Sequence, residues 1–332
     1  MWRYLLLFLA ALALAAGCAG MGASTPLISL ELPVGCKLGN RCFILQYPDR
    51  DPGPGAVDYG CGRMTYDTHK GTDFAVSDEF LMAQGVSVIA SAPGKVLRVR
   101  DGVADRLVKT QEDKATVEGS ECGNGVVVDH GNGWETQYCH LRQGSVSVRP
   151  NQQVQAGERL GLVGASGLAS FPHVHVTVRH QGKVVDPAVG VTEETGCKVS
   201  PKSLWAEDLP YKPTGLIRSG VSSKPPTIDG LWAGEFQPLQ LSSRSEALVF
   251  WVHVYGLLEG DQESFEIRDP QGNVLIADER TSDRPNRVSM GFVGKRFEPG
   301  TISPGKWNGL YQLTRNEETL VSVSQSFEVT VQ

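Results

Sequence analysis

Two histidines stand two residues apart in the stretch FPHVHVTVRH, residues 171–180, within an alternating run of valines. Successive side chains of an extended chain point to opposite faces, so the valines would line one face and His173 and His175 the other. Neutral imidazole is both the commonest metal ligand and a base near neutral pH. The pair alone fits either the solvent face of a half-buried strand or a metal-binding or catalytic face. Partners elsewhere in the chain must decide between the two.

A second group of residues that could do chemistry lies upstream, in THKGTDFAV. His69, Gly71 and Asp73 follow one another at steps of two, so all three would share one face of an extended segment. Gly71 has no side chain and would leave room for a bulky neighbour between the other two. A third candidate, His140 in YCHL, is expected at the end of a strand. By itself, the His69–Asp73 pair could equally be two polar residues at the protein surface.

The elements that would carry these residues are short strands. From Cys36 to Cys197, valine-rich runs alternate with glycine and proline turns, which predicts an all-β sandwich or barrel-like domain. DHGNGW, residues 129–134, is a predicted hairpin turn whose glycines and Asn132 take positive φ angles. The charged segment 101–121 is expected to be a surface insertion.

The remaining chain predicts a second domain, in line with the length of 332 residues. Residues 198–225 are rich in Pro, Ser and Lys and are expected to form a linker. Residues 226–332 alternate apolar and polar residues around turns, which fits an immunoglobulin-like β-sandwich. We expect this sandwich to position the first domain or to bind a partner. His253 is assigned to the sandwich, and His130 and His180 are expected to be exposed.

The N-terminus indicates export. The apolar run from Tyr4 to Ala16 is too short to span a bilayer and predicts a signal peptide, residues 1–17. AAGC at its end resembles the lipobox of bacterial lipoproteins, in which Cys18 would carry the lipid anchor, although ordinary cleavage nearby stays open. A tether, 18–35, would follow. The resemblance implies a periplasmic protein anchored to the outer membrane. The net charge of −6 argues against binding of nucleic acid.

The cysteines other than Cys18 are six, an even number that suggests disulfides in an oxidising compartment. The expected pairs are Cys122–Cys139, Cys36–Cys42 and Cys61–Cys197. The first would join two strands of the predicted hairpin. The second closes a short loop, and the third follows by elimination.

Together the motifs resemble those of one family, the lysostaphin-type (LytM-like) zinc endopeptidases of bacterial cell walls. That family's pattern is H-x-G-x-D, then Y-x-H-L, then H-x-H after a proline. Here the three motifs are HKGTD at 69–73, YCHL at 138–141 and HVH at 173–175. The resemblance covers about residues 64–187 and implies a zinc peptidase domain, expected at 36–197, with a metal cleft between antiparallel sheets.

By this resemblance His69, Asp73 and His175 bind one zinc ion per chain, and the fourth position stays open for water, as a catalytic zinc site requires. His173 and His140 would be the catalytic pair. His173 would take a proton from the water, and His140 would stabilise the tetrahedral intermediate or share the proton transfer.

The resemblance implies an endopeptidase that cuts peptide cross-links or stem peptides of peptidoglycan. Nothing in these motifs resembles the pair of acidic residues that glycoside hydrolysis usually requires, so glycan chains should stay intact. The alternative is a catalytically silent or latent protein on the same fold that binds the cell wall or activates an amidase.

Overall fold

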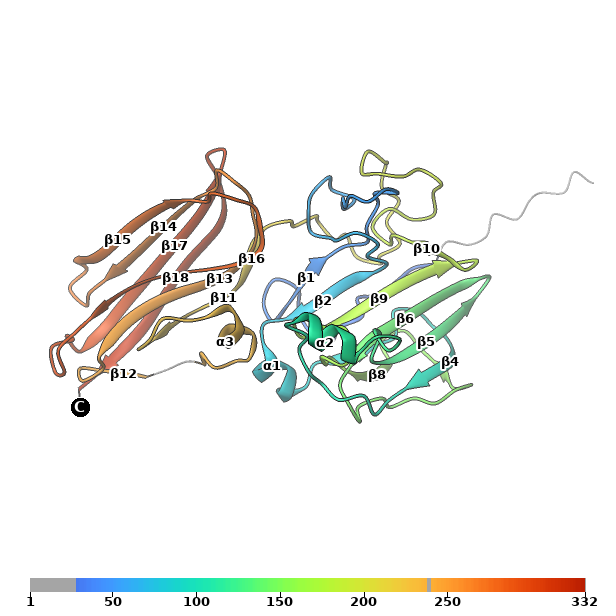
Figure 1. Ribbon diagram of the computed structural model, residues 1–332, viewed down its shortest axis with the longest axis horizontal. Helices are drawn as coiled ribbons and strands as arrows, with labels where there is room; N and C mark the ends of the chain where they lie inside the picture. Colours follow the sequence, from blue (N-terminus) through green and yellow to red (C-terminus); the bar gives the residue numbers. More distant parts are fainter. Residues whose placement is uncertain (1–27, 238–239, 332) are drawn as a thin grey trace, which may run out of the picture.

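The computed structural model describes residues 28–237 and 240–331 and shows two β-rich domains side by side (Figure 1). The three helices within these two ranges are one or two turns long: α1 (Glu79–Gln84), α2 (Gln111–Thr116) and α3 (Ile228–Trp232). The predicted all-β class is therefore confirmed. No helix in the two described ranges has the length and apolar character needed to cross a membrane. The signal peptide, Cys18 and the first part of the tether lie outside the described residues.

The first domain contains an eight-stranded sheet in the order β1-β2-β9-β6-β5-β4-β7, with β10 added beside β9. Its strands are β1 (Cys42–Gln46), β2 (Thr72–Val76), β4 (Gly94–Arg100), β5 (Asn124–Gly131), β6 (Trp134–Leu141), β7 (Gln153–Val154), β9 (His173–His180) and β10 (Lys183–Val185). A separate pair, β3 (Ser87–Ile89) with β8 (Arg159–Leu162), packs against it. The predicted hairpin joins β5 to β6, and Asn132 has a φ of 50°.

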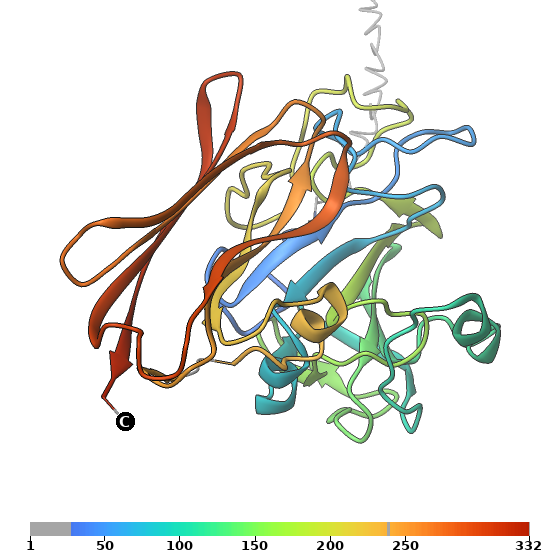
Figure 2. The same cartoon turned by 60° about the vertical axis from the view of Figure 1, so that its left-hand side comes forward.

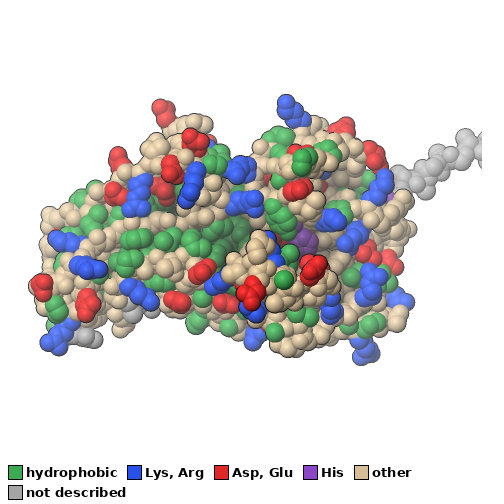
Figure 3. Space-filling model, viewed as in Figure 1, with side chains coloured by type: hydrophobic (Ala, Val, Ile, Leu, Met, Phe, Trp, Pro, Cys, Tyr) green, Lys and Arg blue, Asp and Glu red, His purple; other side chains and the backbone are tan. Residues whose placement is uncertain are grey.

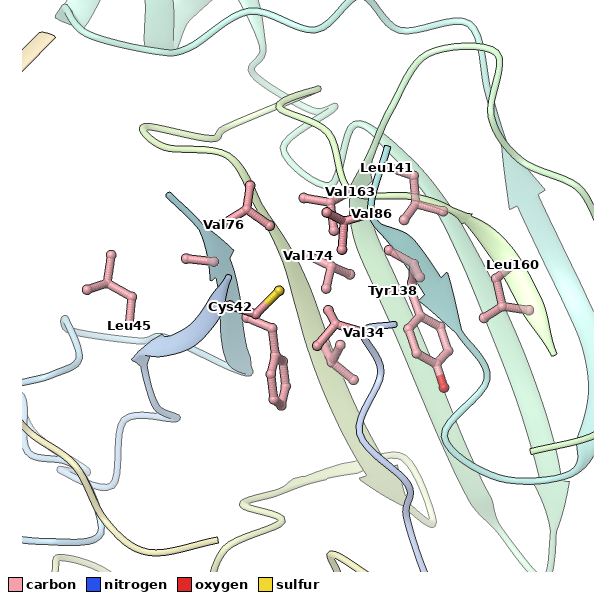
Figure 4. Packing of buried hydrophobic residues seen from close by; sticks show 14 of the residues in the cluster. Val34, Cys42, Leu45, Val76, Val86, Tyr138, Leu141, Leu160, Val163 and Val174 are labelled. Atoms are coloured by element: carbon pink, nitrogen blue, oxygen red, sulfur yellow. The ribbon is translucent and has the colours of Figure 1, made fainter. Parts of the chain in front are cut away.

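The core of the first domain lies on the valine face of β9. Val174, Val176 and Val178 are at most 1% exposed, as the alternation of the sequence predicts. Figure 4 shows Val174 beside Tyr138 of β6 and Val163, with Val34 and Cys42 close by. Burying side chains of this size stabilises the fold by about 1.5–3 kcal/mol each. The opposite face of β9 is left for the histidines.

The edges of this domain extend beyond the expected boundaries. Leu30 and Val34, expected in a tether, are at most 4% exposed and belong to the core. Leu204 and Trp205, expected in a linker, pack into the same core, and Leu30 donates its N–H to the carbonyl of Leu204. These apolar side chains occur in segments rich in turn-forming residues. The composition of the segments therefore gave no sign that these residues are buried. The domain limits stay a proposal.

Three disulfides hold the first domain: Cys36–Cys42, Cys61–Cys197 and Cys122–Cys139. All three expected pairs are thus confirmed. Cys61–Cys197 ties the loop before β2 to the segment that leaves the domain. Cys122–Cys139 links the segment just before β5 to strand β6. Cys139 directly precedes His140, near the end of β6.

The second domain consists of two sheets packed face to face (Figures 1 and 2). One sheet has the order β11-β13-β16 and the other β12-β18-β17-β14-β15. Their bounds are β11 (Gly215–Ser222), β12 (Leu241–Ser242), β13 (Ala247–Leu257), β14 (Gln262–Arg268), β15 (Val274–Thr281), β16 (Asn286–Arg296), β17 (Gly305–Arg315) and β18 (Glu318–Thr330). Phe250 of one sheet and Tyr311 of the other are both fully buried between them. The chain therefore has a β-sandwich here, and its immunoglobulin-like character stays a prediction.

The two domains share an interface. β11 begins at Gly215, inside the segment expected as a linker, so the connection is shorter than predicted. The outer face of β11-β13-β16 turns toward the first domain, where Tyr255 stacks on Phe43 with ring centroids 5.7 Å apart. Arg218 of β11 pairs with Asp78, the N-cap residue of α1, at 3.0 Å. Figure 1 shows α3 on this side of the sandwich, next to α1.

Candidate metal centre

The metal-binding candidates come from two neighbouring strands and the loop before one of them. Asp73 of β2 lies directly opposite His175 of β9 in the antiparallel register. His69 lies in the loop that leads into β2. The carboxylate oxygen Oδ1 of Asp73 is 2.8 Å from His175 Nδ1 and 3.2 Å from His69 Nε2, and these two nitrogens are 3.2 Å apart.

The triangle formed by these three ligand atoms has the dimensions of a metal site. Ligand atoms about 2.0–2.1 Å from a tetrahedral zinc ion lie roughly 3.3 Å from one another. The three atoms here are slightly closer, and they form a group that could hold a metal ion. The donor set of two imidazoles and one carboxylate is one that zinc accepts in catalytic sites. Zinc remains the metal we propose.

Each candidate ligand histidine is oriented through its other ring nitrogen. His69 Nδ1 is 2.7 Å from the carbonyl oxygen of Tyr47, just after β1. A carbonyl can only accept a hydrogen bond, so Nδ1 carries the proton and the Nε2 lone pair faces the site. His175 Nε2 is 3.0 Å from Thr177 Oγ1, which leaves Nδ1 toward the site. Such outer contacts fix both tautomer and ring orientation in metal sites.

Gly71 is required by the packing at this point. A Cβ atom there would lie 2.5 Å from His175 Nε2 and 2.6 Å from the carbonyl oxygen of Val176. A side chain at this position would therefore push the imidazole of His175 out of place. The room that the sequence predicts beside Gly71 is occupied by this imidazole.

The two candidate catalytic histidines lie next to the triangle. His173 Nε2 is 3.7 Å from Asp73 Oδ1, and the rings of His140 and His173 are 4.6 Å apart. His140 Nδ1 contacts the carbonyl oxygen of Ser166, and His173 Nδ1 that of Phe171, both at 2.8 Å. Both rings therefore present an Nε2 lone pair that can accept a proton.

The backbone of His140 explains how its side chain reaches the site. Cys139 lies opposite His175, so His140 in a regular strand would point to the other face, toward the core. Instead His140 has a φ of 62°, in the left-handed region that few residues other than glycine adopt. Its N–H donates to the carbonyl of Cys122, beside the Cys122–Cys139 disulfide.

The electrostatics of the cluster favour a charged Asp73 and neutral imidazoles at His140 and His173. Burial alone would lower the pKa of His69, but the Asp73 carboxylate beside it outweighs burial and raises that pKa. Burial lowers the pKa of His173 and, together with the nearby rings of His173 and His175, that of His140. Burial opposes the charged form of Asp73, but His69 and His173 outweigh it and hold the pKa of this carboxyl well below its usual range. A general base needs a neutral imidazole, and a metal-ligating carboxyl needs to be ionised.

The structure brings together all five side chains that the sequence singles out, while His130, His180 and His253 lie outside the cluster. His130 and His180 are half-buried rather than exposed.

Sequence reasoning missed two ring contacts. Tyr66 lies over His69 with centroids 4.4 Å apart, and Phe171 stacks on His173 at the same distance. Figure 3 shows a histidine surface beside apolar side chains on the first domain.

Comparisons with known proteins match the part of the chain that carries the five candidate residues. Residues 67–187 match Peptidase family M23. The chain is 38% identical to cell division protein DipM of Caulobacter vibrioides over 32% of this chain and 15% of that protein. It is 32% identical to peptidoglycan DD-endopeptidase ShyA of Vibrio cholerae over 36% of this chain and 22% of that protein. The chain thus spans less than a quarter of these two curated relatives.

A zinc-containing peptidase from Vibrio cholerae, known from its crystal structure, is 26% identical over 44% of this chain and 39% of that chain, with a TM-score of 0.28. The match to the family covers all five candidate residues, from His69 to His175, in the order that the motifs require. The part of the chain from residue 67 to residue 187 is a peptidase family M23 (LytM-like) domain.

Proposed function

We propose that this protein is a zinc-dependent endopeptidase that hydrolyses peptide cross-links or stem peptides of bacterial peptidoglycan. One observation carries the proposal: two buried imidazoles, each held at Nδ1 by a carbonyl oxygen, lie beside a His–Asp–His triangle of metal-ligand size. A similar relative, ShyA, is named a peptidoglycan DD-endopeptidase, which supports this class of substrate.

His69, Asp73 and His175 would hold the zinc ion, which polarises a carbonyl group and makes water more acidic when it is bound. His173 accepts a proton from the attacking water at Nε2, and the carbonyl of Phe171 keeps its ring in the required tautomer. The proton taken by His173 must reach the amine that leaves. His140 Nε2 can accept this proton from His173 and donate it to the amine, which returns both imidazoles to the neutral state.

The test is digestion of purified sacculi by zinc-loaded protein, with the new termini identified by mass spectrometry. We expect new amines and carboxylates in the peptides and no new reducing sugar ends. A chelator should abolish the reaction and zinc should restore it. His180→Ala is a matched control because His180 lies on the same strand as His173 but outside the cluster, and it should stay active. New reducing ends without new amines would refute the proposal.

A second candidate is a latent or silent protein of the same family that binds the cell wall or activates an amidase. The observation that favours it is burial: the side chain of His175 is 15% exposed, and those of His69 and Asp73 are 1% and 3% exposed. Access to the site is therefore narrow. Zinc-loaded protein that binds sacculi but releases no amines would support this candidate and exclude the first.

For the location we propose an exported, periplasmic lipoprotein of the outer membrane, because AAGC follows the apolar run at the N-terminus. Cys18→Ser should move the protein from the membrane fraction to the soluble fraction. A mature chain in which Cys18 is present without a lipid would contradict this. The sandwich domain is proposed to bind a protein or wall partner or to position the enzyme.

A further inference from the structure

A column of stacked rings crosses the interface between the two domains and ends at the metal centre. Trp232 of α3 stacks on Phe171, with centroids 5.6 Å apart and planes at 30°. Phe171 stacks on His173 at 4.4 Å and 29°. On its other side, Trp232 meets the ring of His253 edge to face at 4.7 Å. The column therefore connects the core strand β13 of the sandwich to the candidate base.

Phe171 holds His173 in two ways. Its carbonyl oxygen accepts the hydrogen bond from His173 Nδ1 at 2.8 Å, and its ring covers one face of the imidazole. Phe171 itself precedes β9 and lies in no strand, so sheet hydrogen bonds do not fix its ring. It is nevertheless only 7% exposed, and Trp232 packs on it. The second domain thus contributes to the position of His173.

Trp232 is held firmly enough for this role. Thr227 caps α3 by accepting a hydrogen bond from the N–H of Gly230. Arg218 donates to the carbonyl of Leu231 at 2.8 Å, and the same guanidinium pairs with Asp78 of the first domain. Trp232 is 6% exposed and belongs to the core of the first domain. The helix is therefore fastened to both domains.

The ring of His253 packs against Trp232 and helps to hold it in place. The side chain is fully buried, and neither ring nitrogen has a hydrogen-bond partner in the described part of the chain. Burial, with the charge of Arg218 nearby, lowers the pKa of His253 to about 3, so the ring is neutral at pH 7. A neutral ring in a T-shaped contact with Trp232 adds to the packing.

We propose that Trp232 is a positioning residue that acts through Phe171 on His173, so that the β-sandwich is a structural part of the catalytic site. This inference rests on the proposed endopeptidase function. A displacement of about 1 Å at a catalytic group can lower the rate by up to 10²-fold. Loss of the Trp232 ring should free Phe171, and with it the ring plane of His173, while the metal ligands stay in place.

The experiment compares Trp232→Leu with Trp232→Phe and with Trp307→Leu. Trp307 is also buried, but it lies in the sandwich core away from the column, which makes it a matched control. With a soluble cross-linked muropeptide we expect Trp232→Leu to lower kcat about tenfold and to change KM by less than about twofold. Trp232→Phe should restore most of kcat, and Trp307→Leu should lower only the Tm.

All variants are compared at equal zinc content and per folded molecule. A zinc-loaded Trp232→Leu variant with unchanged kcat would overturn the inference, as would an equal loss of kcat in Trp307→Leu. If Trp232 acts through Phe171, the double variant with Phe171→Leu should lose no more kcat than Phe171→Leu alone. Additive losses would mean that Trp232 does not act through Phe171.

A second readout does not depend on activity. In ¹⁵N-histidine spectra of the zinc-loaded protein, His173, assigned with His173→Ala, should show the Nδ1-protonated tautomer. Trp232→Leu should shift this signal or mix the two tautomers, whereas Trp307→Leu should not. An inactive parent protein with this spectral change would refute the endopeptidase function but leave the positioning role standing. An active parent protein whose His173 signal is the same in Trp232→Leu would refute the positioning role.

Discussion

Three histidines of the metal centre each have Nδ1 bound to a backbone carbonyl. His69 uses that of Tyr47, His140 that of Ser166, and His173 that of Phe171. Because a carbonyl accepts and never donates, the proton sits on Nδ1 and the lone pair on Nε2. In the proposed assignment, the same contact prepares a metal ligand in His69 and a proton acceptor in the other two. For His140 it follows that hydrogen-bond donation from Nε2 requires prior protonation.

The division between ligands and catalytic histidines gives a prediction at the residue scale. His175→Ala removes one corner of the triangle and should lose the metal, because two ligands remain. His173→Ala should keep about one zinc per chain and lose peptide cleavage, because only the base is removed. Elemental analysis of dialysed protein measures the first effect and muropeptide hydrolysis the second. Equal metal loss in both variants would show that the two roles are assigned wrongly.

Strand alternation accounts for how much of the site can be predicted from the sequence. The valine spacing of β9 places His173 and His175 on one face, and Asp73 comes from the neighbouring strand β2. His69 reaches the site from the loop before β2 and not by strand alternation. The positive φ of His140 could not be predicted, since nothing in YCHL marks a left-handed residue. The ring column could not be predicted either, because Phe171 and Trp232 are 61 positions apart and meet only through the domain interface.

The turn after β10 contains a buried carboxylate that makes stability depend on pH. Asp186 Oδ1 accepts the N–H of Ala188, but Oδ2 has no hydrogen-bond partner among the described residues. The nearest guanidinium, that of Arg50, is 3.9 Å away and also donates to the carbonyls of Glu194 and Gly196. Burial therefore raises the pKa of Asp186 to about 6.

Since the folded-state pKa lies above the unfolded value, protonation of Asp186 favours the folded state. The stabilising contribution is complete below about pH 4 and is lost as the pH rises through about 6. Asp186→Asn removes this dependence. Relative to the parent protein, its free energy of unfolding should rise by about 3 kcal/mol between pH 4 and pH 8. Urea unfolding across this range measures the difference, and parallel curves for the two proteins would contradict the assignment.

At the scale of the whole molecule, the two domains act as one unit through a buried ion pair as well as through rings. The side chains of Arg218 and Asp78 are 15% and 4% exposed, and Asp78 also caps α1 by accepting the N–H of Leu81 at 2.7 Å. Removing one partner of such a pair leaves a buried charge without compensation, which costs about 3–5 kcal/mol. The attachment of the sandwich to the peptidase domain should therefore depend on both residues together.

Arg218→Met should lower the free energy of unfolding by about 3 kcal/mol or more, because it strands the Asp78 carboxylate and removes the donor to Leu231. Calorimetry should then resolve two unfolding transitions in place of one. Adding Asp78→Ser should recover part of the loss, since serine still caps α1 and carries no charge. Arg280→Met is the matched control: its partner Asp278 is 42% exposed, so the cost should stay below about 1 kcal/mol. A double variant less stable than Arg218→Met alone would mean that the buried charge of Asp78 is not what the arginine compensates.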